Sequence, residues 1–168
     1  LKVAPPPEIP VMTYERNIMA AELAALDTVA THTSVPTPQV LWSDRSHKHL
    51  PRDLFVMERC DGTTLDKLRP TLSPEQHDHL DTSVAGFLGQ MNAMSGTRFG
   101  LQAPDAQRFN TWRDAFTALV DHVLRDANRA QVALPVSARA VAALIETSSD
   151  ALDAVEQPSF VHWDLWDG

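Results

Sequence analysis

The residue pattern of this chain changes near residue 60, and the change limits the folds that the chain can adopt. Before it, two short runs rich in strand-forming residues, 39–43 and 54–60, flank a polar loop, which predicts an antiparallel hairpin. After it, apolar residues recur at helical spacing, as at Leu80, Val84 and Leu88. The sequence therefore predicts an α+β fold, with a small sheet in its first part and mostly helices in its second.

A further strand and a helix are predicted before the hairpin. Residues 1–4 read as the end of a strand that three prolines close, because proline donates no hydrogen bond to a sheet. Thr13 has the chemistry of a helix cap, and it precedes a helix that we predict over residues 14–29.

Two carboxylates of this predicted helix are candidate partners for a lysine. Glu22 lies on the apolar stripe of the helix, four residues from both Ile18 and Leu26. A carboxylate on a buried face is costly unless a cation meets it, and Lys2 in the preceding strand is the candidate cation. Glu15 stands seven residues before Glu22 on nearly the same face, so it is the alternative partner.

Cap residues mark the helix starts in the second part of the chain. Ser73 precedes a proline and stands three residues before a glutamine, which is the pattern of a capping box. Asn110 or Thr111 opens the next amphipathic helix, and Ser137 caps a last one. The apolar stripes of these helices indicate a packed core rather than a cofactor site.

A strand-like run at residues 160–161 is followed by the tripeptide His162-Trp163-Asp164, which we predict to lie in a loop near the end of the chain. A His-x-Asp pair arises readily by chance, and a second copy stands at residues 79–81. That copy lies inside a helical pattern with no strand before it, which indicates a solvated helix face. The preceding strand distinguishes the terminal copy, and Asp164 is therefore a candidate catalytic base.

The composition favours a globular protein and argues against two classes of partner. Of 168 residues, 43% are hydrophobic and 21% are charged, and no apolar run approaches the roughly 20 residues needed to cross a bilayer. There are 14 basic and 22 acidic residues, a net charge of -8, so we expect no nucleic-acid or membrane partner. The single Cys60 cannot form an internal disulfide, in agreement with a cytoplasmic location.

Acidic residues are concentrated after residue 60, where the sequence has fifteen acidic and eight basic residues. This excess would attract a cationic ligand, although a solvated acidic surface is the favoured explanation. Both ends of the chain indicate a fragment, since Leu1 stands within a strand and Gly168 inside a loop motif. We therefore expect the 168 residues to belong to a longer protein.

Five segments, namely residues 1–3, the helix of Glu22, and residues 35–38, 55–65 and 162–168, follow one another in a characteristic order and spacing. Together they resemble the aminoglycoside phosphotransferase family, small-molecule kinases that share the protein-kinase fold. The resemblance implies a two-lobe, protein-kinase-like fold that is incomplete here. Residues 1–60 would form part of the small N-terminal lobe, and residues 61–168 part of the helical lobe that ends in the catalytic loop.

The resemblance also implies which residues bind ATP. Lys2 would hold the α- and β-phosphates, and Glu22 would pair with it and fix its ammonium group. Met57, Glu58 and Cys60 would belong to the hinge, where main-chain groups of Glu58 and Cys60 bind the purine.

Two further roles concern catalysis. Asp164 would accept the proton of the substrate hydroxyl as it attacks the γ-phosphate, and His162 would hold the loop in shape. The family's metal-binding Asn and Asp would follow residue 168, so no residue of this chain is assigned to a metal. No glycine-rich loop precedes Lys2, and Asn92 occupies a place where the family often has a histidine. We therefore expect the 168 residues alone to be inactive.

These expectations describe an ATP- and Mg²⁺-dependent kinase, a phosphotransferase with an alcohol group as acceptor. Its substrate would be an aminoglycoside-like or other small hydroxylated molecule, with a cationic one as an option. Kinases of sugars, fructosamine, choline-like molecules, homoserine or macrolides share the motifs and are alternatives. A pseudokinase that only binds nucleotide is a second class. A metal-dependent hydrolase using His162 and Asp164 is a third, disfavoured because no second ligand cluster accompanies them.

Overall fold

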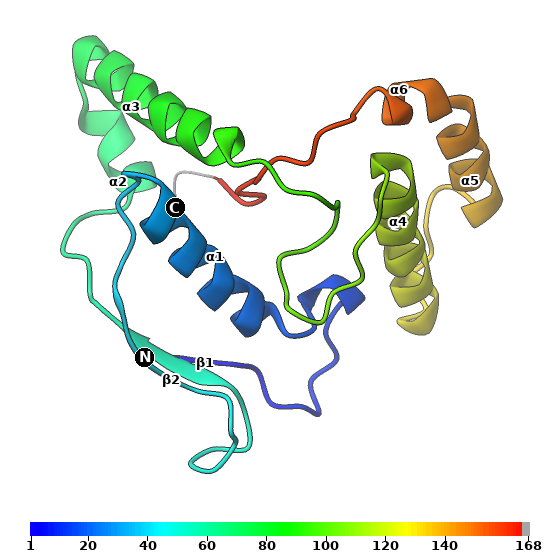
Figure 1. The fold of residues 1–168 in the computed structure, drawn as a ribbon, viewed down its shortest axis with the longest axis horizontal. Helices are drawn as coiled ribbons and strands as arrows, with labels where there is room; N and C mark the ends of the chain where they lie inside the picture. The colour runs from blue at the N-terminus through cyan, green and yellow to red at the C-terminus, as the bar shows by residue number, and fades with distance from the viewer. Residues whose placement is uncertain (166–168) are drawn as a thin grey trace. The chain divides into compact units, whose positions relative to one another are not determined.

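The computed structural model describes residues 1–165, so the last three residues of the terminal motif, 166–168, lie outside the described part. The fold is α+β, as predicted, with short strands before a mostly helical stretch (Figure 1). In chain order the elements are β1 (Lys2–Val3), the 3-10 turn η1 (Thr13–Glu15), α1 (Ile18–His32), β2 (Val40–Asp44), β3 (Leu54–Met57), α2 (Leu65–Leu68), the 3-10 turn η2 (Arg69–Thr71), α3 (Pro74–Ala93), α4 (Trp112–Arg129), α5 (Ala138–Thr147) and α6 (Ser149–Asp153).

The chain forms two units that interleave along the sequence. Unit 1 comprises residues 1–3, 25–95 and the described residues from 159 onward, whereas unit 2 comprises residues 4–24 and 96–158. One of the points at which the chain passes between them, residues 24–25, falls within α1. The lobe boundary that the family resemblance implies near residue 60 is a separate expectation, and it stays a prediction.

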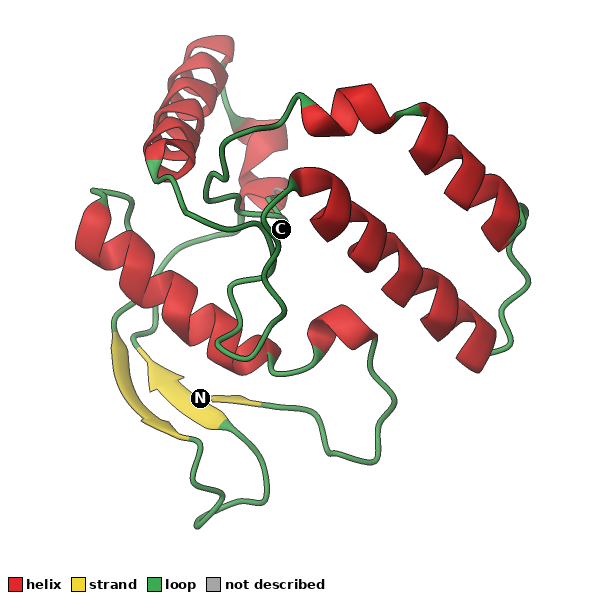
Figure 2. Ribbon diagram, turned by 45° about the vertical axis from the view of Figure 1, so that its right-hand side comes forward, coloured by secondary structure: helices red, strands yellow, loops and turns green. Residues whose placement is uncertain are grey.

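Unit 1 contains a three-stranded antiparallel sheet in the order β1-β3-β2, drawn in yellow in Figure 2. Phe55 in the central strand is paired with Lys2 of β1 and with Ser43 of β2. The Phe55 side chain is fully buried, and that of its neighbour Leu54 is 6% exposed. Because successive side chains of a strand point to opposite faces, the burial of both means that both faces of β3 are covered.

The helix starts were predicted from local chemistry, and the structure confirms three of them. At the start of α3, the Ser73 N–H donates to Gln76 Oε1 at 2.8 Å and the Gln76 N–H donates to Ser73 Oγ at 3.3 Å, which is a capping box. Thr111 and Ser137 cap α4 and α5, each accepting a hydrogen bond at 3.1 Å from the N–H three residues on. Of the two residues proposed to open α4, Thr111 is therefore the cap.

Two helix boundaries differ from the prediction. Thr13 begins the short turn η1, and α1 starts only at Ile18, because Asn17 adopts a left-handed φ of 56°. The last predicted helix is likewise interrupted at Ser148, whose φ of -101° and ψ of 11° separate α5 from α6. No helix in the described part of the chain has both the length and the apolar character needed to cross a membrane.

Candidate functional site

An extended segment of unit 1 leads into the loop that carries His162 and Asp164. The Phe160 N–H donates to the Met94 carbonyl at 2.9 Å, and Ser159 forms an isolated antiparallel bridge just before it. The strand predicted here is therefore reduced to a single bridge with the residues that follow α3. Both His162 and Asp164 are exposed to solvent, as a general base must be if it is to reach a substrate hydroxyl.

The backbone between these two residues is strained. Trp163 has a φ of 74°, in the left-handed region that a bulky side chain rarely adopts. Such a conformation costs about 1–3 kcal/mol and persists where the surrounding structure imposes it, most often at functional sites. The second His-x-Asp copy has no such feature, since His79 and Asp81 lie on the exposed face of α3, as predicted.

The segment that follows β3 has main-chain groups that the fold leaves unbonded. The Glu58 N–H donates to the Gln39 carbonyl at 2.8 Å, which extends the ladder between β2 and β3 by one residue. In the described part of the chain, no hydrogen bond uses the Glu58 carbonyl or the Cys60 N–H. Met57 is half-buried, whereas Glu58 and Cys60 are exposed. This segment therefore offers one acceptor and one donor, two residues apart, to a molecule outside the fold.

Lys2 lies in β1 next to the central strand of the sheet. Its ammonium Nζ is 6.0 Å from the centre of the Phe55 ring, within reach of a cation–π interaction, and the residue as a whole is exposed. The contact with the buried ring is therefore made by the ammonium head of the side chain.

The two candidate partners of Lys2 differ in their local environment. Glu15 lies in η1, and its carboxylate accepts a hydrogen bond from the Met12 N–H at 2.7 Å, which closes that turn. Glu22 is half-buried in α1. Lys2 belongs to unit 1 and Glu22 to unit 2, so the pairing of these two residues stays a prediction.

Asp126 of α4 holds the start of the turn η1, and the sequence reasoning missed it. This carboxylate is 3% exposed and accepts hydrogen bonds from the Thr13 N–H at 2.5 Å and the Thr13 hydroxyl at 2.8 Å. It also forms an ion pair with Arg129, whose Nη2 lies 3.0 Å away. The bonds from Thr13, foremost that of its N–H, lower the pKa of Asp126 below its ordinary value of 3.8. The contribution of Asp126 to folding is therefore present above that ordinary value and is lost as the pH falls through the lowered one. The available signal was its position seven residues after Leu119 on the apolar stripe of the helix.

The structure groups most of the predicted site residues in one unit. Unit 1 contains Lys2, Met57, Glu58, Cys60, His162 and Asp164. Within residues 1–165, no cluster of three or more His, Cys, Asp or Glu side chains could hold a metal ion.

The comparisons with known proteins give one match. A model of the phosphotransferase enzyme family matches residues 1–168, the whole of the chain. No curated protein matches the sequence, and no solved structure matches the fold.

Proposed function

The chain belongs to the phosphotransferase enzyme family, and from this premise we propose that it carries the nucleotide-binding and catalytic residues of an ATP-dependent small-molecule kinase. The family match over residues 1–168 is the observation that carries the proposal. The proposal goes beyond family membership in four respects. These are the protein-kinase-like arrangement, the nucleotide, the metal and the acceptor hydroxyl.

The chemistry of the segment after β3 fits a purine. An adenine edge presents an amino donor beside a ring-nitrogen acceptor, so it needs one carbonyl and one N–H from the protein. The Glu58 carbonyl and the Cys60 N–H supply this pair, and both residues are exposed. Because only main-chain groups are involved, the side chains of Glu58 and Cys60 are not expected to decide nucleotide affinity.

Lys2 is assigned to the α- and β-phosphates, where its ammonium compensates their negative charge. The place of Lys2 in β1, beside the central strand of the sheet, supports the assignment. Glu22 is assigned as its partner in preference to Glu15. The Glu15 carboxylate accepts the Met12 N–H and so has a local role in closing η1, which is why it is the second choice.

Asp164 is assigned as the base that accepts the proton of the acceptor hydroxyl, and His162 as the residue that holds the loop. ATP with Mg²⁺, when bound, supplies the γ-phosphoryl group and the cation that neutralises its charge. The strained backbone at Trp163 supports a catalytic role for this loop, because it fixes the direction of the neighbouring side chains at a cost in stability.

The acceptor that we propose is a small hydroxylated molecule, in the first instance an aminoglycoside-like one. The net charge of -8, with the acidic excess after residue 60, favours a cationic substrate over an anionic one. Sugars, choline-like molecules and the other acceptors named above remain alternatives within the same chemistry.

Cys60 provides a test of the nucleotide site that does not depend on turnover. We expect Mg²⁺·ATP to slow the alkylation of Cys60 by iodoacetamide in the full-length protein by about tenfold or more, since occupied main-chain groups shield the exposed thiol beside them. Mass spectrometry of the peptide that contains Cys60 measures the rate. Mg²⁺·tripolyphosphate, which has a similar charge but no purine, is the matched control and should protect far less. Equal rates with and without ATP would contradict the assignment of the hinge.

A further inference from the structure

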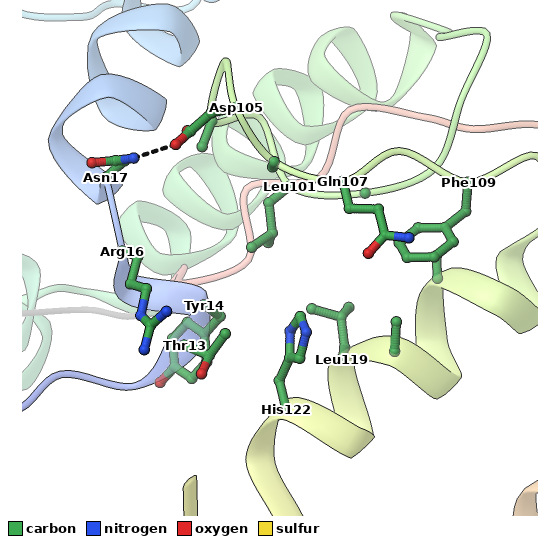
Figure 3. A pocket seen from close by; sticks show the side chains of 15 residues that line it. Thr13, Tyr14, Arg16, Asn17, Leu101, Asp105, Gln107, Phe109, Leu119 and His122 are labelled. Atoms are coloured by element: carbon green, nitrogen blue, oxygen red, sulfur yellow. Dashed lines mark hydrogen bonds between the residues drawn. The ribbon is translucent and has the colours of Figure 1, made fainter. Parts of the chain in front are cut away.

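Unit 2 contains a cavity of about 210 Å³ that the proposed kinase chemistry does not use (Figure 3). One wall is the stretch from η1 to the first residue before α1, a second is the loop 100–109, and the third is the first part of α4. These three segments are distant in the sequence, so the cavity is a product of the fold rather than of a local motif.

The walls of this cavity are held in place by hydrogen bonds. Phe99 and Phe109 exchange two backbone hydrogen bonds of 2.9 Å, which close the loop at its base. At the other end of the loop, the Asn17 amide donates to the Asp105 carboxylate, the contact drawn as a dashed line in Figure 3. Asp126 fixes the third wall to η1 through Thr13, as described above. A site whose walls are already fixed loses little entropy when a ligand enters.

Gly100 makes the path of the loop possible. Its φ is 137°, and a Cβ atom at this position would lie 2.7 Å from the Gln107 carbonyl oxygen. No other residue type fits there without a shift of the backbone.

The inner surface is mostly apolar and is lined by small side chains. Its alanines leave space that larger residues would fill, and Leu101, Leu119 and Phe109 supply larger apolar surfaces around them; the alanines are Ala103, Ala106, Ala115 and Ala118. The volume is below the roughly 300 Å³ at which drug-sized sites begin, so a molecule with a single ring is the size that it accommodates.

The polar groups of the lining favour an anionic head group. Arg16 is exposed, and in the described part of the chain its guanidinium makes no hydrogen bond or ion pair, although its positive charge acts on the Asp126 carboxylate behind η1 and helps to lower the pKa of that group. The Asp105 carboxylate, by contrast, is turned toward Asn17, whose amide donates to one of its oxygens. In Figure 3 the His122 ring and the Gln107 carboxamide come from different walls and face the same space, and both contain N–H donors.

We infer that this cavity binds a small aromatic carboxylate, with its ring against the alanine and leucine side chains and its carboxylate at Arg16. Planar guanidinium and carboxylate groups form paired, charge-assisted hydrogen bonds, and an aromatic ring packs well beside Phe109. The inference concerns a site separate from the proposed kinase residues, and it does not depend on phosphoryl transfer.

Isothermal titration of the full-length protein with benzoate, benzyl alcohol and benzylamine tests the inference. Benzoate should bind at least about tenfold more tightly than either of the other two probes. Filling the space with Ala118→Leu should abolish benzoate binding, whereas Ala142→Leu, an exposed alanine of α5, should leave it unchanged.

A second variant, which removes a surface charge, tests the inference even if the Ala118→Leu protein does not fold. Arg16→Gln should weaken benzoate binding about tenfold while leaving benzyl alcohol unaffected, and Arg125→Gln, an exposed arginine of α4 outside the cavity, should change neither. Absence of benzoate binding, equal binding of benzylamine, or full benzoate binding by Ala118→Leu would each overturn the inference.

Discussion

Replacing Asp164 with asparagine should lower kcat of the full-length protein by about 10²- to 10⁴-fold and leave the Kd for nucleotide within about twofold. The two side chains have nearly the same shape, but a neutral amide does not accept a proton from a hydroxyl. The loop carries its strain at the neighbouring Trp163, so this exchange should not alter the backbone. Steady-state kinetics together with a nucleotide-binding titration separate the two parameters.

The second His-x-Asp pair supplies a matched control for this variant. Asp81→Asn makes the same chemical change on the exposed face of α3, where Asp81 forms an ion pair with Arg69 at 3.2 Å. Loss of such a surface pair costs at most about 1 kcal/mol, and kcat should remain at the wild-type value. If Asp164→Asn retained normal turnover, Asp164 would have no place in the mechanism.

Replacing Lys2 with alanine should lower kcat/KM for ATP by about 10- to 100-fold, the equivalent of one strong charge-assisted interaction with the phosphates. If Glu22 fixes the lysine, then Glu22→Ala should produce a loss of similar size. The double variant should then be little worse than either single one, because both changes remove the same interaction.

Glu15→Ala distinguishes the two candidate carboxylates. It removes the acceptor of the Met12 N–H in η1, so we expect a loss of about 1 kcal/mol in the free energy of unfolding and an unchanged kcat/KM. Chemical denaturation run beside the kinetic assay measures both quantities. A loss of kcat/KM in Glu15→Ala that is absent in Glu22→Ala would assign the lysine partner to Glu15 instead.

The parts of the fold that could be predicted from sequence are those decided by nearby residues. The caps of α3, α4 and α5 depend on a hydroxyl and an N–H three residues apart, and these are adjacent in any helix that starts there. The hairpin between β2 and β3 followed from two apolar runs around a polar loop.

The parts that were missed depend on contacts between distant segments. The left-handed backbone at Asn17 separates η1 from α1. Thr13, the first residue of η1, is held by Asp126, which is 113 residues away along the chain. The cavity also depends on distant segments, since its three walls come together only in the folded unit. Hydrophobic periodicity predicts which face of a helix is buried, but not which segment covers that face.

The candidate site shows the same division. The local pattern favoured Asp164 over Asp81, because a strand-like run precedes Asp164 and a helical pattern surrounds Asp81. The structure confirms that Asp81 lies in α3, whereas the catalytic role of Asp164 stays a prediction. The choice between Glu22 and Glu15 could not be made from periodicity, because both lie on nearly the same side of one helical pattern. The structure gives Glu15 a local role, since its carboxylate accepts the Met12 N–H, and the choice between the two stays a prediction.

Transfer of labelled γ-phosphate from Mg²⁺·ATP to an acceptor hydroxyl is the measurement that tests the kinase proposal most directly. The full-length protein would be incubated with aminoglycosides, amino alcohols and sugars in turn, while ADP and the phosphate ester are measured together. We predict equal amounts of ADP and ester with one class of acceptor. Nucleotide binding without any ester across all three classes would contradict the account and identify a protein that binds nucleotide without catalysing its transfer.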